Sequence, residues 1–479
     1  MQIGGATIGI RIISIVSGIV LARLLDPRDF GLVALVQVVL STAGYFSGLG
    51  LAAAVIQSQT DRGKVAFQAF VVTAVAGTVL FLVLVINAGF FAALLGNTEI
   101  ISIFRWLSIT VLLGTLMGVP EALLQKELLF GRASAIVIIC ELLHTALAVG
   151  MALGGLGVWS LVYASVARSF VNLALIWMMC PGWDWLIPKP WDRQIMTTLM
   201  RFGLQITGSG VMSFFYSIID SYSVGRFLGA APLGFYSKAY EFTIRTVYGF
   251  SSVISVVLLP SYARIQNEKE RLSRAYLKSL RVVSFLTVPM SMGIFITAPE
   301  MVSTLLGEKW LPMIAPLEVM AFVGLIMPIS ASTAALFSST GRPDYNMRAG
   351  AVVTVVLIPM IFLLLGSGIT GVAFAVLIAH VLGFAFNIYQ VHTILEHTAS
   401  KMLPAVFPAL IGTAVMMMCV QFSKPVLLFF GGGAITIASL IVMVFVGIII
   451  YSSVLYVIQR SLVIELVGLA VGRPGSEER

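Results

Sequence analysis

The sequence predicts an all-α polytopic membrane protein with about fourteen transmembrane helices, and three observations lead to this class. The 479 residues are 59% apolar and only 10% charged, whereas an ordinary soluble domain is about one-quarter charged. Apolar stretches of the ~20 residues needed to span a bilayer recur along the whole chain. The pieces between them reach only about twenty residues, too few for a separate soluble domain.

The predicted spans are bounded by charged residues or by Gly, Pro and Asn. One of them, 232–259, contains the charges Lys238, Glu241 and Arg245. Pro328 and Pro359 lie inside two others, 313–339 and 350–366, and membrane helices tolerate proline where neighbours satisfy the freed carbonyl. The fourteen ranges are 3–24, 30–56, 66–91, 100–124, 133–153, 157–179, 202–225, 232–259, 282–306, 313–339, 350–366, 370–391, 404–422 and 434–458.

The net charge is +8, and the placement of its Lys and Arg residues tests this topology because cytoplasmic loops are enriched in both. With the N-terminus inside, five of the 29 cations lie outside or at outer helix ends: Arg23, Arg28, Arg226, Lys309 and Lys424. Five more lie within helices: Arg11, Arg105, Arg168, Lys238 and Arg245. The other nineteen lie in inner loops and the C-terminal tail. This excess predicts both termini in the cytoplasm and accounts for the basic charge without nucleic acid, which is not an expected partner.

Short similar segments in the two halves of the chain, called echoes below, predict an internal duplication. ARLLDPRDFG at 22–31 resembles GRFLGAAPLG at 225–234, an offset of 203 residues. Leu94 to Gly96 and Gly131-Arg132 recur 211 and 210 residues later. A six-helix unit duplicated in parallel gives two lobes related by a pseudo-two-fold axis along the membrane normal, an arrangement typical of transporters.

The duplication sets the expected domain organisation. Residues 1–180 form an N-lobe, 181–201 a cytoplasmic connection, 202–398 a C-lobe, and 399–479 two further helices with a cytoplasmic tail. The basic loop 261–280 has helical apolar spacing and is expected to form an amphipathic helix on the inner membrane surface.

Five stretches resemble bacterial polysaccharide flippases of the Wzx type, in the branch that exports colanic and teichuronic acids. They are ARLLDPRDFG at 22–31, ALLQKELLF at 122–130, GFYSKAY at 234–240, LPSYARIQ at 259–266 and LLGEKWLP at 305–312. The resemblance implies alternating-access transport of undecaprenyl-diphosphate-linked oligosaccharide across the bacterial cytoplasmic membrane. It implies a monomeric non-enzyme without a cofactor, with membrane lipids and the polysaccharide polymerase machinery as partners besides the lipid-linked substrate.

Cations within helices are the expected ligands of the diphosphate headgroup, because charges in membrane spans are rare and usually functional. Arg11, Arg168, Lys238 and Arg245 are the candidates, and arginine suits phosphate because its planar fork donates paired hydrogen bonds. Ion pairing is the alternative for the last two, because Lys238, Glu241 and Arg245 share one helix face.

Three further polar residues are candidates for coupling transport to a proton or cation. Glu141 and His144 share a face of the fifth helix, and Asp220 lies in the outer third of the seventh. Such groups titrate near working pH in low-dielectric surroundings. A structural hydrogen-bonding role for Asp220 is the alternative.

The remaining motifs indicate structure. Gly44, Gly48 and Gly50 fit close helix packing, and Trp183, Trp185 and Trp191 fit an interfacial belt. The triple glycine 431–433 fits a flexible turn. The three cysteines are widely separated, so neither a disulfide framework nor a metal site is expected.

Two other functions compete with the flippase. A drug/cation antiporter of the same superfamily shares the two-lobe architecture, and its preferred acidic cavity residues are matched here by Glu121, Glu141, Asp220, Glu241 and Glu318. A membrane enzyme such as a polysaccharide polymerase or glycosyltransferase would need a sizeable outer catalytic loop or a soluble nucleotide-sugar domain, and the pieces between the spans, about twenty residues, are too short for either. The sequence also contains no nucleophile elbow, phosphate loop or HExxH motif.

Overall fold

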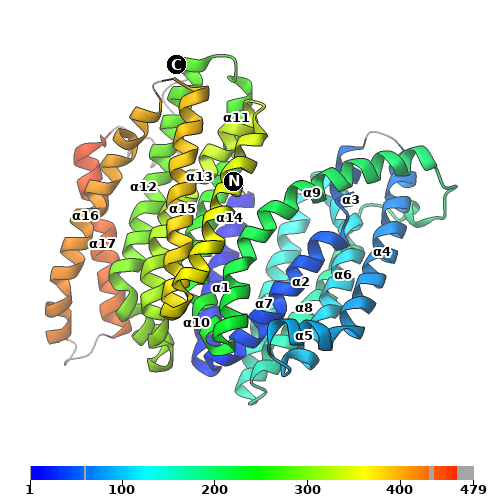
Figure 1. Ribbon diagram of the computed structural model, residues 1–479, viewed down its shortest axis with the longest axis horizontal. Coiled ribbons are helices and arrows are strands. Elements are labelled where there is room, and N and C mark those ends of the chain that lie inside the picture. The colour runs from blue at the N-terminus through cyan, green and yellow to red at the C-terminus, as the bar shows by residue number, and fades with distance from the viewer. Residues whose placement is uncertain (1, 59–60, 397, 431–435, 461–479) are drawn as a thin grey trace. The chain divides into compact units, whose positions relative to one another are not determined.

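The computed structural model describes residues 2–58, 61–396, 398–430 and 436–460 (Figure 1). Side chains are described in these ranges except at 2–8, 10–12, 130, 206, 208–217, 250–257 and 430. The described chain is helical and contains no strand, which confirms the all-α part of the predicted fold class. It divides into two compact units, Met1–Lys238 and Ala239–Arg479.

The first unit is a helix bundle in which most of the main contacts join helices that are not adjacent in sequence. α4 packs on α6, α6 on α8, and α7 on both α8 and α1. α2 and α3 together contact α6 and α9. Its elements are α1 (Gln2–Leu24), α2 (Pro27–Ser47), α3 (Leu51–Gln57), α4 (Arg62–Ile86), α5 (Ala88–Leu95), α6 (Ile100–Lys126), α7 (Phe130–Leu153), α8 (Val158–Met179), η1 (Asp184–Leu186), α9 (Arg193–Ser223), η2 (Val224–Leu228) and most of α10 (Ala230–Tyr240).

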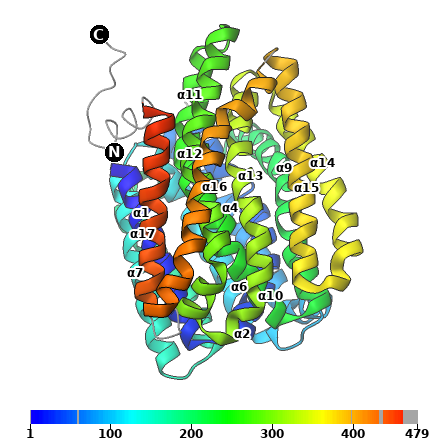
Figure 2. The same cartoon turned by 90° about the vertical axis from the view of Figure 1, so that its left-hand side faces the viewer.

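The second unit is also a helix bundle, in which α12 and α13 pack together and α16 lies along both α12 and α17 (Figure 2). α14 and α15 form a hairpin, and α13 contacts α11 and α15. The elements are η3 (Glu241–Arg245), α11 (Thr246–Arg264), α12 (Lys269–Met301), η4 (Val302–Leu306), η5 (Glu308–Met313), α13 (Ile314–Ser339), α14 (Pro343–Leu364), η6 (Leu365–Ser367), α15 (Gly368–Ile394), α16 (Ala399–Phe430) and α17 (Ile437–Ile458).

Every predicted span overlaps a helix of the structure. Ten described helical stretches are long and apolar enough to cross a membrane, and one of them, Pro343–Ile394, contains both α14 and α15. The described apolar part of α1, Ile13–Leu24, is shorter. The predicted span 232–259 is a continuous run in which the π-helical turn η3 joins α10 to α11.

The loop predicted as a separate amphipathic surface helix is divided between two helices. Its first residues end α11 at Arg264, and its second half begins α12 at Lys269. The apolar side chains of Leu272 and Tyr276 are buried in a protein core with residues of α13 and α15. Tyr276 also lies in hydrogen-bonding contact with Thr333, 2.8 Å between hydroxyl oxygens. The helical periodicity of this loop therefore reflects packing against protein.

The connection after α8 packs against the start of α4. Trp185 is 1% exposed and lies edge-on to Phe70, with 5.5 Å between ring centroids. This residue belongs to the core and not to the interfacial belt predicted from the sequence. Asp61 caps α4, and the backbone hydrogen bond from Lys64, at 3.4 Å, lowers the pKa of its carboxyl. Lys189 of the connection lies 3.9 Å from the same carboxylate.

Two glycines of the first sequence echo make reciprocal contacts between α2 and α10. A Cβ added at Gly31 would overlap the backbone carbonyl of Ala230, and a Cβ added at Gly234 would overlap that of Pro27. Ala230 follows Pro27 by 203 residues, the same offset that separates the two glycines. Each copy of the motif therefore contacts the other through equivalent positions, the pattern of a two-fold contact.

The predicted role of glycine in helix packing holds at only one of three positions. Gly50 has a φ of 65°, and a Cβ there would overlap the backbone of Gly203 in α9. Gly44 and Gly48, in contrast, have no heavy atom within 4 Å of an added Cβ. These two glycines face open space.

We expect Gly31→Ala and Gly234→Ala each to destabilise the protein by about 1–3 kcal/mol, because the new methyl group forces two backbones apart. Gly150→Ala is the matched control, since an added Cβ at Gly150 meets no atom within 4 Å. Thermal unfolding of the purified protein in detergent measures the effect. Equal unfolding temperatures for all three variants would contradict a close contact at Gly31 and Gly234.

Candidate functional site

The structure pairs two of the candidate residues, Arg168 and Glu141, across α7 and α8. Arg168 Nη1 lies 3.1 Å from Glu141 Oε2, and Ser14 of α1 donates a hydrogen bond of 2.6 Å to Oε1 of the same carboxylate. The Glu141 side chain is 10% exposed, whereas that of Arg168 is 41% exposed. The carboxylate is thus enclosed, while the guanidinium keeps part of its donor fork accessible.

His144 lies one turn beyond Glu141 on α7 and is half-buried. It is within electrostatic reach of both Arg168 and Glu141. A titratable imidazole therefore stands beside a semi-exposed ion pair, which is a suitable arrangement for linking protonation to the charge of the pair. The sequence placed Glu141 and His144 on one face, but it did not show that Arg168 joins them.

Asp220 and Lys238 are buried, and each has a specific partner in the first unit. Asp220 Oδ2 accepts a hydrogen bond of 2.8 Å from the Tyr236 hydroxyl, and Oδ1 accepts one of 2.6 Å from the Ser221 backbone N–H. The Lys238 ammonium stands over the ring of Phe30, 4.4 Å from its centroid. A cation over an aromatic face is stabilised by the ring's quadrupole.

The other two predicted headgroup cations differ in what surrounds them. Arg245 is exposed at the last position of η3, and no ion pair joins it to a residue that the structure describes. η3 is a π-helical turn, and such turns often mark functional positions in helices. Arg11 lies in α1, and its side chain is outside those described.

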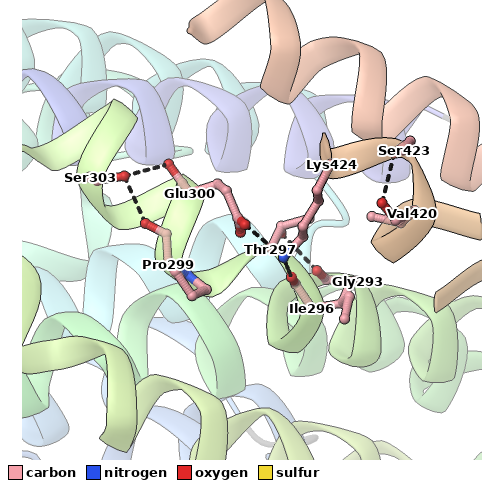
Figure 3. Close-up of polar contacts among 9 residues, drawn as sticks. All are labelled: Gly293, Ile296, Thr297, Pro299, Glu300, Ser303, Val420, Ser423 and Lys424. Atoms are coloured by element: carbon pink, nitrogen blue, oxygen red, sulfur yellow. Dashed lines mark hydrogen bonds and ion pairs between the residues drawn. The ribbon is translucent and has the colours of Figure 1, made fainter. Parts of the chain in front are cut away.

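A second buried ion pair, between α12 and α16, was missed by the sequence analysis. Lys424 Nζ lies 2.7 Å from Glu300 Oε1 and donates a hydrogen bond of 2.7 Å to the Ile296 carbonyl (Figure 3). The two side chains are 14% and 13% exposed. Glu318 of α13 is within electrostatic reach of both charges.

The sequence contained part of the signal for this pair. Glu300 falls inside the predicted span 282–306, where any charge requires a partner. Lys424 was assigned to an outer helix end because the predicted span stopped at 422, whereas α16 continues to Phe430. The two residues are 124 positions apart, so only the packing of α12 against α16 brings them together.

Comparison with known proteins identifies the family. The family model described as "Polysaccharide biosynthesis protein" matches residues 20–315, more than half of the chain. The chain therefore belongs to this polysaccharide biosynthesis protein family, which confirms the resemblance seen in the sequence.

Individual relatives and structures agree with this assignment. The chain is 24% identical to lipopolysaccharide biosynthesis protein WzxC of Escherichia coli K12 over 74% of its own length and 72% of that protein. It is 21% identical to the probable low-salt glycan biosynthesis flippase Agl15 of Haloferax volcanii, over 91% of both chains.

Among solved structures, the lipid II flippase MurJ in its inward closed conformation superposes with a TM-score of 0.76 at 13% identity, covering 96% of this chain and 99% of that one. An inward-facing multidrug resistance MATE transporter superposes with a TM-score of 0.65 at 16% identity, covering 82% and 99%. The fold is thus shared by lipid and drug transporters, and the chain is a multi-pass membrane protein.

We expect Lys424→Met to lower the free energy of unfolding by about 3 kcal/mol, because it leaves Glu300 charged and enclosed without its partner. The double variant Lys424→Met/Glu300→Gln should recover much of this loss. Lys401→Met, at an exposed position near the start of the same helix, is the control. Thermal unfolding of these three variants, of the single variant Glu300→Gln and of the wild type measures the effects. Additive effects of Lys424→Met and Glu300→Gln in the double variant would show that the pair does not interact.

Proposed function

We propose that the protein flips undecaprenyl-diphosphate-linked oligosaccharide repeat units across the bacterial cytoplasmic membrane, for the assembly of an exopolysaccharide, capsule or O-antigen type of polymer. Membership of the polysaccharide biosynthesis family carries this proposal. The relative named as a probable glycan biosynthesis flippase, matched over 91% of both chains, supports it. The drug/cation antiporter shares the fold, but no feature of the described residues favours it over the family assignment.

The proposed mechanism is alternating access without covalent chemistry or a cofactor. In this proposal the chain crosses the membrane fourteen times, as two six-helix lobes, 1–180 and 202–398, joined by 181–201 and followed by two helices in 399–479. Both termini lie in the cytoplasm, as the loop charges predict. The reciprocal contacts of Gly31 and Gly234 support the pseudo-two-fold relation. The transporter acts as a monomer and delivers its product to polymerase machinery.

Arg168 and Arg245 are the proposed principal ligands of the diphosphate. Both keep a guanidinium at least partly exposed, so each can exchange water for phosphate oxygens. Arg11 and Lys238 are proposed in supporting roles, and the ammonium of Lys238 already interacts with the ring of Phe30.

Coupling to a proton or cation is proposed at Glu141, His144 and Asp220. A proton on His144 or Glu141 would change the charge next to Arg168, and thereby the affinity of that arginine for phosphate. The hydrogen bond from Tyr236 to Asp220 makes Asp220 equally suited to a structural role. Replacing Asp220 by Asn keeps an acceptor oxygen but removes the ionisable carboxylate. Normal transport in this variant would therefore indicate the structural role, and a loss of coupling would indicate the coupling role.

A reconstitution experiment tests the flippase proposal. A fluorescent undecaprenyl-diphosphate oligosaccharide is placed in vesicles with and without the purified protein, and its accessibility from each leaflet is followed over time. We expect the protein to accelerate equilibration, and an inward proton gradient to change the rate. Equal rates in protein-containing and empty vesicles, under every imposed gradient, would reject the function.

Variants of Arg168 test the headgroup role separately from folding. Arg168→Ala should reduce flipping at least tenfold, but it also leaves Glu141 enclosed and unpaired. The double variant Arg168→Ala/Glu141→Gln removes the stranded charge, so it should restore thermal stability without restoring transport. Arg245→Ala leaves no described carboxylate without an ion-pair partner, so it should reduce flipping without lowering thermal stability. Full transport in the double variant would exclude Arg168 as a headgroup ligand.

A further inference from the structure

A cavity of about 390 Å³ lies among α2, α4 and α6 of the first unit. This volume is in the range of about 300–1,000 Å³ that small-molecule sites occupy. Four glycines open it, as two pairs one turn apart: Gly44 on α2 with Gly48 at the C-cap of the same helix, and Gly114 and Gly118 on α6. At all four, an added Cβ would meet no heavy atom within 4 Å, so the space belongs to the cavity and not to a helix contact.

Side-chain hydroxyls supply the polar part of the lining. Thr110 and Thr115 of α6 donate to the carbonyls of Leu107 and Leu112 at 2.6 and 2.7 Å. The remaining three also donate to carbonyls of their own helices, at 2.6 to 2.9 Å; they are Ser41, Ser47 and Thr73.

These hydrogen bonds determine what the cavity can offer to a ligand. A hydroxyl has one donor hydrogen and two acceptor lone pairs. Because each of the five hydrogens is held by a backbone carbonyl, the hydroxyls present acceptors to the cavity. Gln37, whose amide reaches Ser41 at 3.3 Å, is the one lining residue with an amide donor, so the lining accepts more hydrogen bonds than it donates.

The lining also excludes several kinds of ligand. The described lining residues include no Asp, Glu, Lys, Arg or aromatic side chain. A diphosphate at neutral pH has acceptors and negative charge but no donor, so it gains nothing from such a surface. A lipophilic cation finds neither a carboxylate nor an aromatic face. A neutral ligand rich in hydroxyl donors matches the lining.

We propose that this cavity binds the sugar part of the lipid-linked substrate, separately from the arginines proposed for its diphosphate. The inference rests on the proposed flippase function for the identity of the ligand. It assigns neutral, hydroxyl-rich sugar residues to α2, α4 and α6. The glycine pairs leave room for the sugar rings, and the hydroxyls accept hydrogen bonds from the ring hydroxyl groups.

Binding of two lipids to the detergent-purified protein tests this assignment. One probe is undecaprenyl diphosphate that carries a neutral hexose tetrasaccharide, and the other is undecaprenyl diphosphate alone. Native mass spectrometry gives the ratio of their affinities. We expect the wild type to prefer the sugar-bearing lipid at least tenfold.

Substitutions that fill the cavity should remove this preference. Gly44→Leu and Gly114→Leu place a side chain where no atom now lies within 4 Å of the Cβ, and the affinity ratio should fall to about one. Gly150→Leu, an exposed position on α7 with equally open space, should keep the ratio. Thr110→Val keeps the shape and removes the acceptor, so it should lower the ratio about threefold to tenfold.

The outcomes separate this inference from the proposed function. An unchanged preference in both leucine variants, or no preference in the wild type, overturns the sugar site even if the wild type flips lipid. A preference that the leucine variants abolish supports the site even if reconstituted wild type flips nothing, in which case the flippase proposal alone fails. Thermal unfolding identifies any leucine variant that misfolds. In that case the affinity ratio of Thr110→Val decides, and an unchanged ratio in that variant overturns the sugar site.

Discussion

Charge inside an apolar environment must be matched locally, and this constraint organises the polar interior of the protein. An enclosed ion without a partner is strongly destabilising, because water is no longer there to solvate it. Glu141 is held by Arg168 and Ser14, and Lys424 by Glu300 and the Ile296 carbonyl. The Lys238 ammonium stands over the ring of Phe30, and the Asp220 carboxylate accepts a hydrogen bond from the Tyr236 hydroxyl. Each contact joins two helices or adjacent turns of the chain, so the same interactions that satisfy charge also align the helices.

Accessibility distinguishes the two ion pairs. Both members of the Lys424 pair are largely enclosed, as befits a link between α12 and α16. In the other pair, Arg168 remains 41% exposed next to an imidazole. A separate uncharged cavity for the sugars would spare the arginines from recognising the whole headgroup. Phosphate and sugar would then be bound by surfaces of opposite hydrogen-bonding character, one of donors and one of acceptors.

The sequence predicted the class of fold well, because apolar runs of membrane length are unambiguous and every expected span overlaps a helix. It also selected Arg168 and Glu141, since charges in spans are rare. It could not pair them, because the pairing depends on how α7 and α8 face each other. Glycine was the least informative residue: Gly50 permits a backbone contact, whereas Gly44 opens a cavity. Only the neighbouring helix decides between these outcomes.

The reciprocal contacts of Gly31 and Gly234 tie together the two similar motifs at 22–31 and 225–234. The similar segments are offset by 203 residues at this motif and by 210 and 211 residues further along. Within the motif, the four-residue step from Pro27 to Gly31 equals that from Ala230 to Gly234. A Cβ at either glycine would overlap the backbone of the other motif. A substitution at one motif therefore displaces the other, so the two segments are mechanically dependent although about 200 residues of sequence separate them.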